Sequence, residues 1–183
     1  MPKFAANLTM LFNEAGFMDR FDLAAANGFR AVEFLFPYDF SVTQLKDALD
    51  RNRLQLVLHN FPAGNWAGGE RGIACHPDRI ADFRNSVDLA LSYATALGVK
   101  QLNCLAGIKP PTVSDIDARR TLIDNLRYAA PKLAAAGIKL LIEPINTYDI
   151  PGFFLNRTQQ ALDIIAEVAA NGGSDNVFLQ YDI

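Results

Sequence analysis

A short pattern that recurs along the chain constrains its fold more than any other feature. The pattern is a glycine, an apolar residue, a basic residue and then an apolar-rich run, and it occurs at 28–34, 98–104 and 137–143. Gly172 precedes a further apolar-rich run at 176–183. Such a pattern is typical of a helix that ends in the left-handed conformation and leads into a buried strand. The glycines lie 70, 39 and 35 residues apart, which predicts a strand-and-helix unit about every 35 residues.

The segments between these runs carry helix-capping signals and apolar stripes of helical period. The expected helices are 17–27, one capped by Ser41 and Gln44, one with Pro77 in its first turn, one from Ser114 to about Ala136, and one that begins at Thr158. The expected strands lie at about 4–8, 31–36, 54–59, 101–106, 139–143 and 176–183. Strands that alternate with helices in this way predict a parallel sheet with right-handed crossovers.

Two architectures share this alternation, an open doubly wound sheet and a TIM barrel. The connection after the first strand lacks the G-x-G-x-x-G fingerprint of a dinucleotide fold, since Gly16 is its only glycine. We therefore expect an α/β protein of the TIM (β/α)8 barrel type, with residues 1–183 as one domain. Eight such units need roughly 280 residues, so we expect the N-terminal portion of a barrel, truncated after about six strands. The alternative is a smaller six-stranded sheet that is complete as it stands.

Composition excludes several classes of function. The net charge is −3 and the 17 lysines and arginines are scattered, whereas nucleic acids and anionic membranes require clustered cations. No apolar run approaches the roughly 18–20 residues of a membrane span, and the first residues lack the apolar core of a secretory signal. Cys75 and Cys104 form neither a disulfide framework nor a C-x-x-C site, and we expect Cys104 in the core. These features indicate a cytoplasmic protein, and the missing dinucleotide fingerprint indicates that it uses no nucleotide cofactor.

Strand alternation turns a set of polar side chains towards one interior. In the last strand it places Val177, Leu179, Tyr181 and Ile183 against the helices, and Phe178, Gln180 and Asp182 on the other face. In the earlier strands it points inward Asn7, Glu33, Gln55, Val57, His59, Asn103, Leu105, Leu141 and Glu143. The polar members concentrate towards the carboxyl ends of the strands, where barrel enzymes carry their active sites.

Glu143 is the strongest catalytic candidate. Pro144 follows it and cannot continue a central strand, so this carboxylate is expected at the rim of an apolar barrel, where it needs a partner. Asp182 is expected at the same height on the neighbouring strand, and a divalent cation between two close carboxylates relieves their repulsion. The alternatives are a salt-bridged structural glutamate and, for Asp182, a helix N-cap.

Other inward-facing side chains are candidates for binding a substrate. His59 suits a ligand or a hydrogen-bond donor, although a histidine satisfied within the core is the commoner case. Asn7 and Asn103 suit the recognition of hydroxyl groups, unless they only tie loops. Glu33 lies deeper, and we expect it to be structural.

The long connection at 60–76 is rich in glycine and carries Trp66 and Arg71. Its length indicates a lid or a substrate-binding loop that includes these two side chains, and the alternative is a disordered connector. Other chemistries find no support, because the chain has no G-x-S-x-G elbow, Walker loop or H-E-x-x-H motif.

Long stretches of the chain match one enzyme family. They are FAANLTMLF (4–12), VEFLFPYDF (32–40), LHNFPAGNWAGGERGIAC (58–75), LNCLAG (102–107), LIEPINTYDIPGFFL (141–155) and LQYDI (179–183). Through them the chain resembles the hydroxypyruvate isomerase family, within the xylose isomerase-like group of TIM barrels, over essentially its whole length. The closely similar 2-oxo-tetronate isomerases share the first two stretches, and retention of LHN, PAGNWAGGERG and EPIN favours hydroxypyruvate.

The resemblance implies a reversible conversion of hydroxypyruvate to tartronate semialdehyde through an enediolate, in glyoxylate and carbohydrate metabolism. In this family a glutamate that ends the fifth strand belongs to the acid/base pair, and it matches Glu143. A divalent metal such as Mg²⁺ or Mn²⁺, where bound, is held by that glutamate and by an aspartate that ends the sixth strand, which matches Asp182. The remaining family ligands, on the seventh and eighth strands, have no counterpart before Ile183.

Alternatives to this function are of two kinds. One is a related isomerase or epimerase of another short 2-oxo acid or ketose. The other is an inactive fragment that binds a small ligand or a metal, or that a second chain completes, since the exposed edges of an unclosed barrel favour homo-oligomers. The related DNA-repair endonucleases are disfavoured by the acidic charge and by the small number of histidines, which is two.

Overall fold

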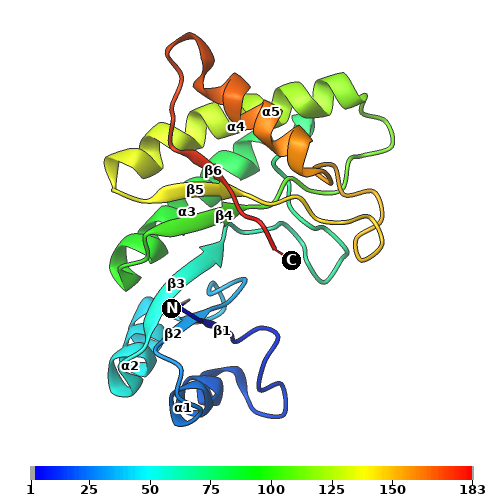
Figure 1. Ribbon diagram of the computed structural model, residues 1–183. Helices are drawn as coiled ribbons and strands as arrows, with labels where there is room; N and C mark the ends of the chain where they lie inside the picture. The colour runs from blue at the N-terminus through cyan, green and yellow to red at the C-terminus, as the bar shows by residue number, and fades with distance from the viewer. Residues whose placement is uncertain (1–2, 183) are drawn as a thin grey trace.

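The computed structural model describes residues 3–182, and its framework is a curved sheet of parallel strands backed by helices (Figure 1). The strands are β1 (Ala6–Asn7), β2 (Ala31–Glu33), β3 (Gln55–Asn60), β4 (Gln101–Cys104), β5 (Lys139–Ile142) and β6 (Val177–Leu179). They lie in the order β1-β2-β3-β4-β5-β6, so each strand pairs with its neighbour in the sequence. A doubly wound sheet reverses its strand order at a switch point, whereas a barrel does not. The observed order therefore agrees with the predicted barrel type.

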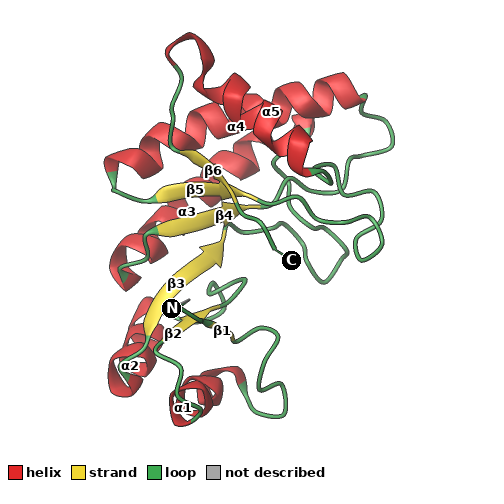
Figure 2. Ribbon diagram, viewed as in Figure 1, coloured by secondary structure: helices red, strands yellow, loops and turns green. Residues whose placement is uncertain are grey.

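Helices cover one face of this sheet, and the loops that follow the strands gather at one end (Figure 2). The helices are α1 (Arg20–Ala26), α2 (Val42–Asn52), α3 (Ile80–Leu97), α4 (Asp115–Ala135) and α5 (Thr158–Ala169), with short 3-10 turns η1 (Phe17–Asp19), η2 (Pro77–Arg79) and η3 (Ala170–Gly172). Ser41 and Gln44 form the predicted capping box, and Ser114 caps α4 through the Asp117 N–H. Pro77 begins η2 rather than a regular helix, so α3 starts three residues later.

The recurring glycines take the conformation that the repeat predicts. Gly28, Gly98, Gly137 and Gly172 have φ of 86°, 72°, 67° and 79°. The long interval between Gly28 and Gly98 contains a further helix end, that of α2. Its C-cap residue is Arg53, which has a φ of 53°. The repeat is therefore regular in structure, although an arginine replaces the glycine at this position.

A β-bulge in β3 changes which side chains face inward. Val32 pairs with Leu56, but the next residue of β2, Glu33, pairs with Leu58, so Val57 is an extra residue in the ladder. Paired residues of a parallel sheet share a face, and an extra residue exchanges the faces of everything after it. Beyond the bulge, Leu58 and Asn60 are therefore the inward-facing residues.

His59 consequently lies on the opposite face from the one predicted. It pairs with Leu102, which is fully buried against the helices, whereas Asn60 pairs with the inward-facing Asn103. The prediction that His59 faces the interior of the barrel is wrong because alternation was counted straight through the bulge.

The sixth strand is shorter than predicted. β6 ends at Leu179, although Gln180 still donates its N–H to the Ile142 carbonyl at 2.9 Å. Tyr181 is 65% exposed and does not pack under the helices as the alternation predicted, and Ile183 lies outside the described residues. The helix-facing side of the sheet is otherwise the expected core, with Val32, Leu102, Cys104, Leu140 and Val177 all buried.

Two substitutions at helix ends test the left-handed positions. Arg53→Gly is expected to raise the free energy of unfolding by about 0.5–1 kcal/mol, because glycine adopts a positive φ without a Cβ clash. Gly98→Ala is expected to lower it by about 1 kcal/mol, and since the added Cβ would meet nothing within 4 Å, the cost is that of the backbone alone. Urea denaturation followed by circular dichroism measures both, and shifts of the same sign would contradict the interpretation.

Candidate active site

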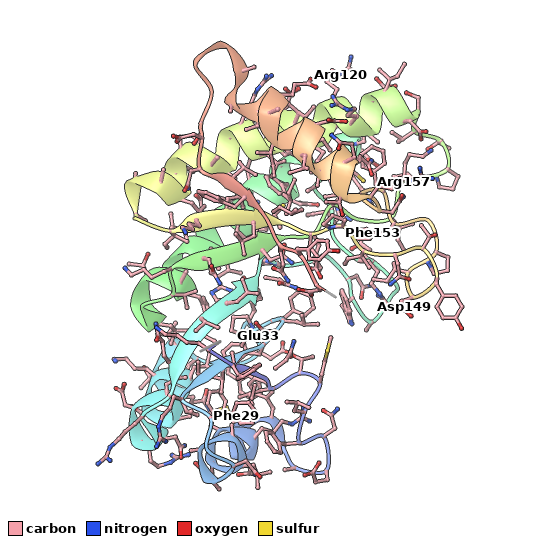
Figure 3. All side chains as sticks on the ribbon, viewed as in Figure 1. Phe29, Glu33, Arg120, Asp149, Phe153 and Arg157 are labelled. Carbon is pink, nitrogen blue, oxygen red and sulfur yellow. The ribbon has the colours of Figure 1, made fainter. Side chains whose placement is uncertain are left out.

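A small polar cavity opens at the carboxyl ends of the strands, on the inner face of the sheet. Its volume is about 60 Å³. Its lining consists of Asn7, Met10, Glu33, Phe34, Leu35, Leu58, Asn60, Glu143, Gln180 and Asp182. The predicted residues Asn7, Glu143 and Asp182 thus come together from β1, the end of β5 and the segment after β6. Glu33, labelled in Figure 3, lies among the side chains within the curve of the sheet.

Each of two glutamates in the cavity is held by an asparagine of the preceding strand. Asn7 donates from Nδ2 to Oε1 of Glu33 at 3.0 Å. Asn103, which is 1% exposed, donates from Nδ2 to Oε2 of Glu143 at 2.7 Å. Asn7 and Asn103, which the sequence marks as candidates for substrate binding, therefore each donate an amide N–H to a neighbouring carboxyl group. In this arrangement they orient the carboxyl groups.

The environment of Glu143 favours its protonated form. Burial, together with a hydrogen bond to the Asp182 carboxyl and the charge on that group, raises the pKa of Glu143 to about 7. The hydrogen bond from Asn103 acts in the opposite direction. Burial also raises the pKa of Glu33, with Asn7 opposing and Asp182 adding to the rise. Glu33, Glu143 and Asp182 thus face one cavity, and Glu143 titrates near neutral pH.

His59 belongs to the layer between the sheet and the helices. Its side chain is fully buried, Nδ1 lies 3.1 Å from the Asn60 carbonyl, and the Tyr38 hydroxyl lies 3.4 Å from the same nitrogen. Burial lowers the pKa of His59 to about 4, partly offset by the hydrogen bond to Asn60, so the ring is neutral at physiological pH. This placement is that of a core histidine and not of the inward-facing ligand that the alternation predicted.

Trp66 and Arg71 contact each other in the loop after β3. The Arg71 guanidinium carbon lies 4.2 Å from the centre of the Trp66 ring, whose other neighbour is Phe36 with ring centres 4.9 Å apart. Trp66 lines a separate cleft of about 250 Å³. Neither side chain lines the cavity around Glu143, so their predicted role in substrate binding stays a prediction.

The loop itself is tied to the body of the protein. Glu70 forms an ion pair with Arg79 at 2.5 Å, and Gly72 bridges to Ala106. A Cβ at Gly72 would lie 2.4 Å from the Leu105 carbonyl oxygen, so this close approach requires glycine. The interpretation of the loop as a disordered connector is therefore wrong.

The oxygen atoms at the cavity provide some of the ligands that a hard divalent cation requires. Glu143 and Asp182 approach one another closely, and the buried Oε1 of Gln180 has no hydrogen-bond partner among residues 3–182. Carboxylate and amide oxygens are the ligands that Mg²⁺ and Mn²⁺ prefer. No group of three His, Cys, Asp or Glu side chains in the described part of the chain is arranged to hold a metal. The described residues therefore offer two carboxylates and one amide oxygen.

Three polar lining residues, Glu33, Asn60 and Gln180, were not singled out as site residues from the sequence, although alternation placed Gln180 on the inner face. Asn60 follows His59 directly and was assigned to the start of the long connection, because a bulge leaves no mark in the hydrophobic pattern. Glu33 was expected to be structural; it lines the cavity wall, and burial raises its pKa above the ordinary value. Its hydrogen bond from Asn7 is visible only in three dimensions.

Known proteins match the chain along its length. The family described as xylose isomerase-like TIM barrel matches residues 21–183. This chain belongs to that family. A hydroxypyruvate isomerase of Escherichia coli is 53% identical over 183 residues, and this alignment covers 100% of the chain and 69% of the relative. A 2-oxo-tetronate isomerase of Cupriavidus necator is 48% identical over 182 residues, with 100% and 68% covered.

A solved structure has the same backbone. The crystal structure of a protein named AP endonuclease, family 2, from Brucella melitensis superposes with a TM-score of 0.95 at 44% identity, covering 100% of this chain and 69% of that one. The predicted barrel type is confirmed by these matches, and the similarity to proteins named as isomerases confirms the predicted enzyme class. Within residues 3–182, no helix is both long enough and apolar enough to span a bilayer.

The raised pKa of Glu143 makes a prediction about stability. Between the ordinary carboxyl pKa and about 7 the folded state binds a proton that the unfolded state releases, so stability falls as the pH rises through this range. The Glu143→Gln variant has no carboxyl group at this position and does not lose stability in this way. The difference in free energy of unfolding between the variant and the unsubstituted protein is therefore expected to change in favour of the variant by on the order of 1–3 kcal/mol from pH 4.5 to pH 8. Urea denaturation at several pH values measures the difference. Glu14→Gln, on an exposed loop, is the control, and parallel pH profiles for all three proteins would contradict the assignment.

Proposed function

We propose that the protein interconverts hydroxypyruvate and tartronate semialdehyde, with Glu143 as the group that transfers the proton. The observation that carries this proposal is a carboxyl group with a pKa of about 7, oriented by Asn103 and facing a polar cavity at the active-site end of a barrel. A general base works best when its pKa lies near the pH of the reaction. The relative at 53% identity, which is named hydroxypyruvate isomerase, supports the choice of substrate.

The reaction moves a carbonyl group by one carbon and is balanced without another reactant. The Glu143 carboxylate removes a proton from the hydroxymethyl carbon of hydroxypyruvate, and the electron pair left behind forms an enediolate with the adjacent carbonyl carbon. The same carboxyl group returns the proton to that adjacent carbon, while the hydroxyl proton passes from one oxygen to the other. The product is an aldehyde beside a secondary alcohol. Asn103 keeps the Glu143 carboxyl pointed into the cavity throughout.

A divalent cation is proposed as the cofactor, with Glu143 and Asp182 as its ligands and the Gln180 amide oxygen adjacent. Such a cation, when bound, supplies a positive charge that stabilises the oxygen of the enediolate. The close approach of the two carboxyl groups and the unpaired Oε1 of Gln180 support this assignment. Mg²⁺ and Mn²⁺ are the ions that this set of oxygen donors favours.

A 2-oxo-tetronate is the second candidate substrate, because a protein named 2-oxo-tetronate isomerase is 48% identical to this chain. The proton transfer would be the same, at a carbon that carries one more hydroxylated carbon. The Brucella melitensis protein is named as an AP endonuclease, but cleavage of DNA at abasic sites is disfavoured for this chain by its net charge of −3.

An activity panel tests the proposal. The purified protein is assayed on hydroxypyruvate, on a 2-oxo-tetronate and on abasic DNA, each with Mg²⁺, with Mn²⁺ and with a chelator. Hydroxypyruvate is expected to give the highest kcat/KM, and with the chelator present this ratio should rise with pH through about 7 as Glu143 loses its proton. Glu143→Gln is expected to reduce kcat by a factor of about 100 or more, which is the usual contribution of a general base.

The exposed Glu14→Gln variant serves as the control and should retain normal rates. A Glu143→Gln variant that turns over within about threefold of the normal rate would overturn the role of Glu143. A folded protein that binds hydroxypyruvate without converting it would instead overturn the proposed activity in favour of a ligand-binding function.

A further inference from the structure

Asn60 ends β3 on the inner face of the sheet, opposite Asn103 in the ladder. Its side chain is 3% exposed and forms part of the cavity wall together with Glu143 and Asp182. The bulge at Val57 is what brings it there, since regular alternation would direct it to the helices. A polar side chain in such a position requires a hydrogen-bond partner.

Asn60 differs from the other two asparagines on this face in how its amide is used. Asn7 donates to Glu33, and Asn103 donates to Glu143. Within residues 3–182, by contrast, the hydrogen bonds of Asn60 all involve its backbone, so both the NH2 group and the carbonyl of its side chain are available to the contents of the cavity. Asn60 is therefore an unused donor and acceptor beside the proposed base.

The backbone around Asn60 is held firmly. Its N–H donates to the Leu35 carbonyl at 2.9 Å, which fastens β3 to the segment after β2. Its carbonyl accepts one hydrogen bond from the Tyr38 hydroxyl at 2.6 Å and another from Nδ1 of His59 at 3.1 Å. His59 and Tyr38 thus fix the Asn60 backbone from the helix side of the sheet while the side chain points to the other side. Because the backbone of Asn60 is fixed in this way, its side chain has fewer orientations to lose when it binds a ligand.

From this geometry we infer that Asn60 is a substrate-binding residue, whose amide hydrogen-bonds the oxygens of the 2-oxo acid, and that Tyr38 is its positioning residue. The inference rests on the proposed function, since it concerns the substrate of that same cavity. A 2-oxo acid presents a carboxylate, a carbonyl and a hydroxyl group on neighbouring carbons. The Asn60 NH2 group suits the carbonyl or carboxylate oxygen, and the Asn60 carbonyl suits the hydroxyl group.

Steady-state kinetics on hydroxypyruvate test this role through the separation of KM from kcat. Asn60→Ala is expected to raise KM by about 10- to 100-fold, the loss typical of a hydrogen bond to a charged group, with a smaller change in kcat. Asn60→Asp keeps the shape and replaces the NH2 donor by a carboxylate, so it should raise KM at least as much. Asn125→Ala is the matched control, because Asn125 is an equally buried asparagine of α4 that does not line the cavity, and it should leave KM unchanged.

The role of Tyr38 is tested in the same assay. Tyr38→Phe is expected to raise KM a few-fold in the unsubstituted protein and to have no effect on KM when Asn60 is already alanine. A merely structural role would give the same change in both backgrounds. Circular dichroism and thermal melting of each variant establish that the proteins compared are folded.

The outcomes separate the inference from the proposed function. If the unsubstituted protein turns over hydroxypyruvate and Asn60→Ala has the same KM, the role of Asn60 is overturned while the proposed activity stands. If the unsubstituted protein neither converts hydroxypyruvate nor binds it in a calorimetric titration, the proposed function fails and the inference fails with it. A KM raised by Asn60→Ala and Asn60→Asp, but not by Asn125→Ala, supports the inference.

Discussion

Parallel pairing in a fixed register decides which side chains meet at the carboxyl end of this sheet. Asn7 lies opposite Glu33, and Asn60 lies opposite Asn103, so side chains that are far apart in the sequence reach the same height on the same face. Hydrogen bonds between strands therefore do more than stabilise the sheet. They set which amide reaches which carboxyl group, and the cavity exists because several polar strand ends converge at one height.

The cost of burying carboxyl groups explains the composition of the inner face. Removing an isolated ionised carboxylate from water has a large free-energy cost. This cost is smaller when a hydrogen-bond donor contacts the carboxylate or when the group is protonated. Asn7 and Asn103 are such donors, each from the strand that precedes its glutamate. They do not cancel the effect of burial, because the pKa values of Glu33 and Glu143 both remain above their ordinary value. A proton held weakly near pH 7 is what remains, and this is the property that proton transfer requires.

The sequence was sufficient for the architecture because its signals are local. Each strand from β2 to β6 follows a helix end marked by a residue with positive φ, and glycine marks four of these ends. Arg53 takes the place of glycine at the fifth, which is why the first two glycines of the repeat lie two units apart. Glu143 could also be predicted, since Pro144 locates the end of its strand and alternation locates its face.

The composition of the cavity was harder to predict because one bulge depends on pairing between strands. Nothing in the hydrophobic pattern of 55–60 distinguishes a regular strand from one with an extra residue at Val57, and alternation therefore selected His59 in place of Asn60. The partners of Asn7, Asn103 and Arg71 were likewise beyond the sequence, because each contact depends on where a side chain of another segment lies. The residue types identified the side chains that can take part in chemistry. The register of the paired strands decided which of these side chains line the same cavity.

The charges on the side chains that line the cavity affect how favourably it can bind the proposed substrate. Among the described lining residues are three carboxyl groups, Glu33, Glu143 and Asp182, and no lysine, arginine or histidine. A 2-oxo acid is itself an anion, so its approach adds a negative charge to a site where each charge already disfavours the next. Two features would offset this repulsion: protons retained on the carboxyl groups with raised pKa values, and the proposed divalent cation, which Glu143 and Asp182 would hold. A retained proton would weaken Glu143 as a base, whereas the cation would leave it ionised, and for this reason the proposed chemistry favours the cation.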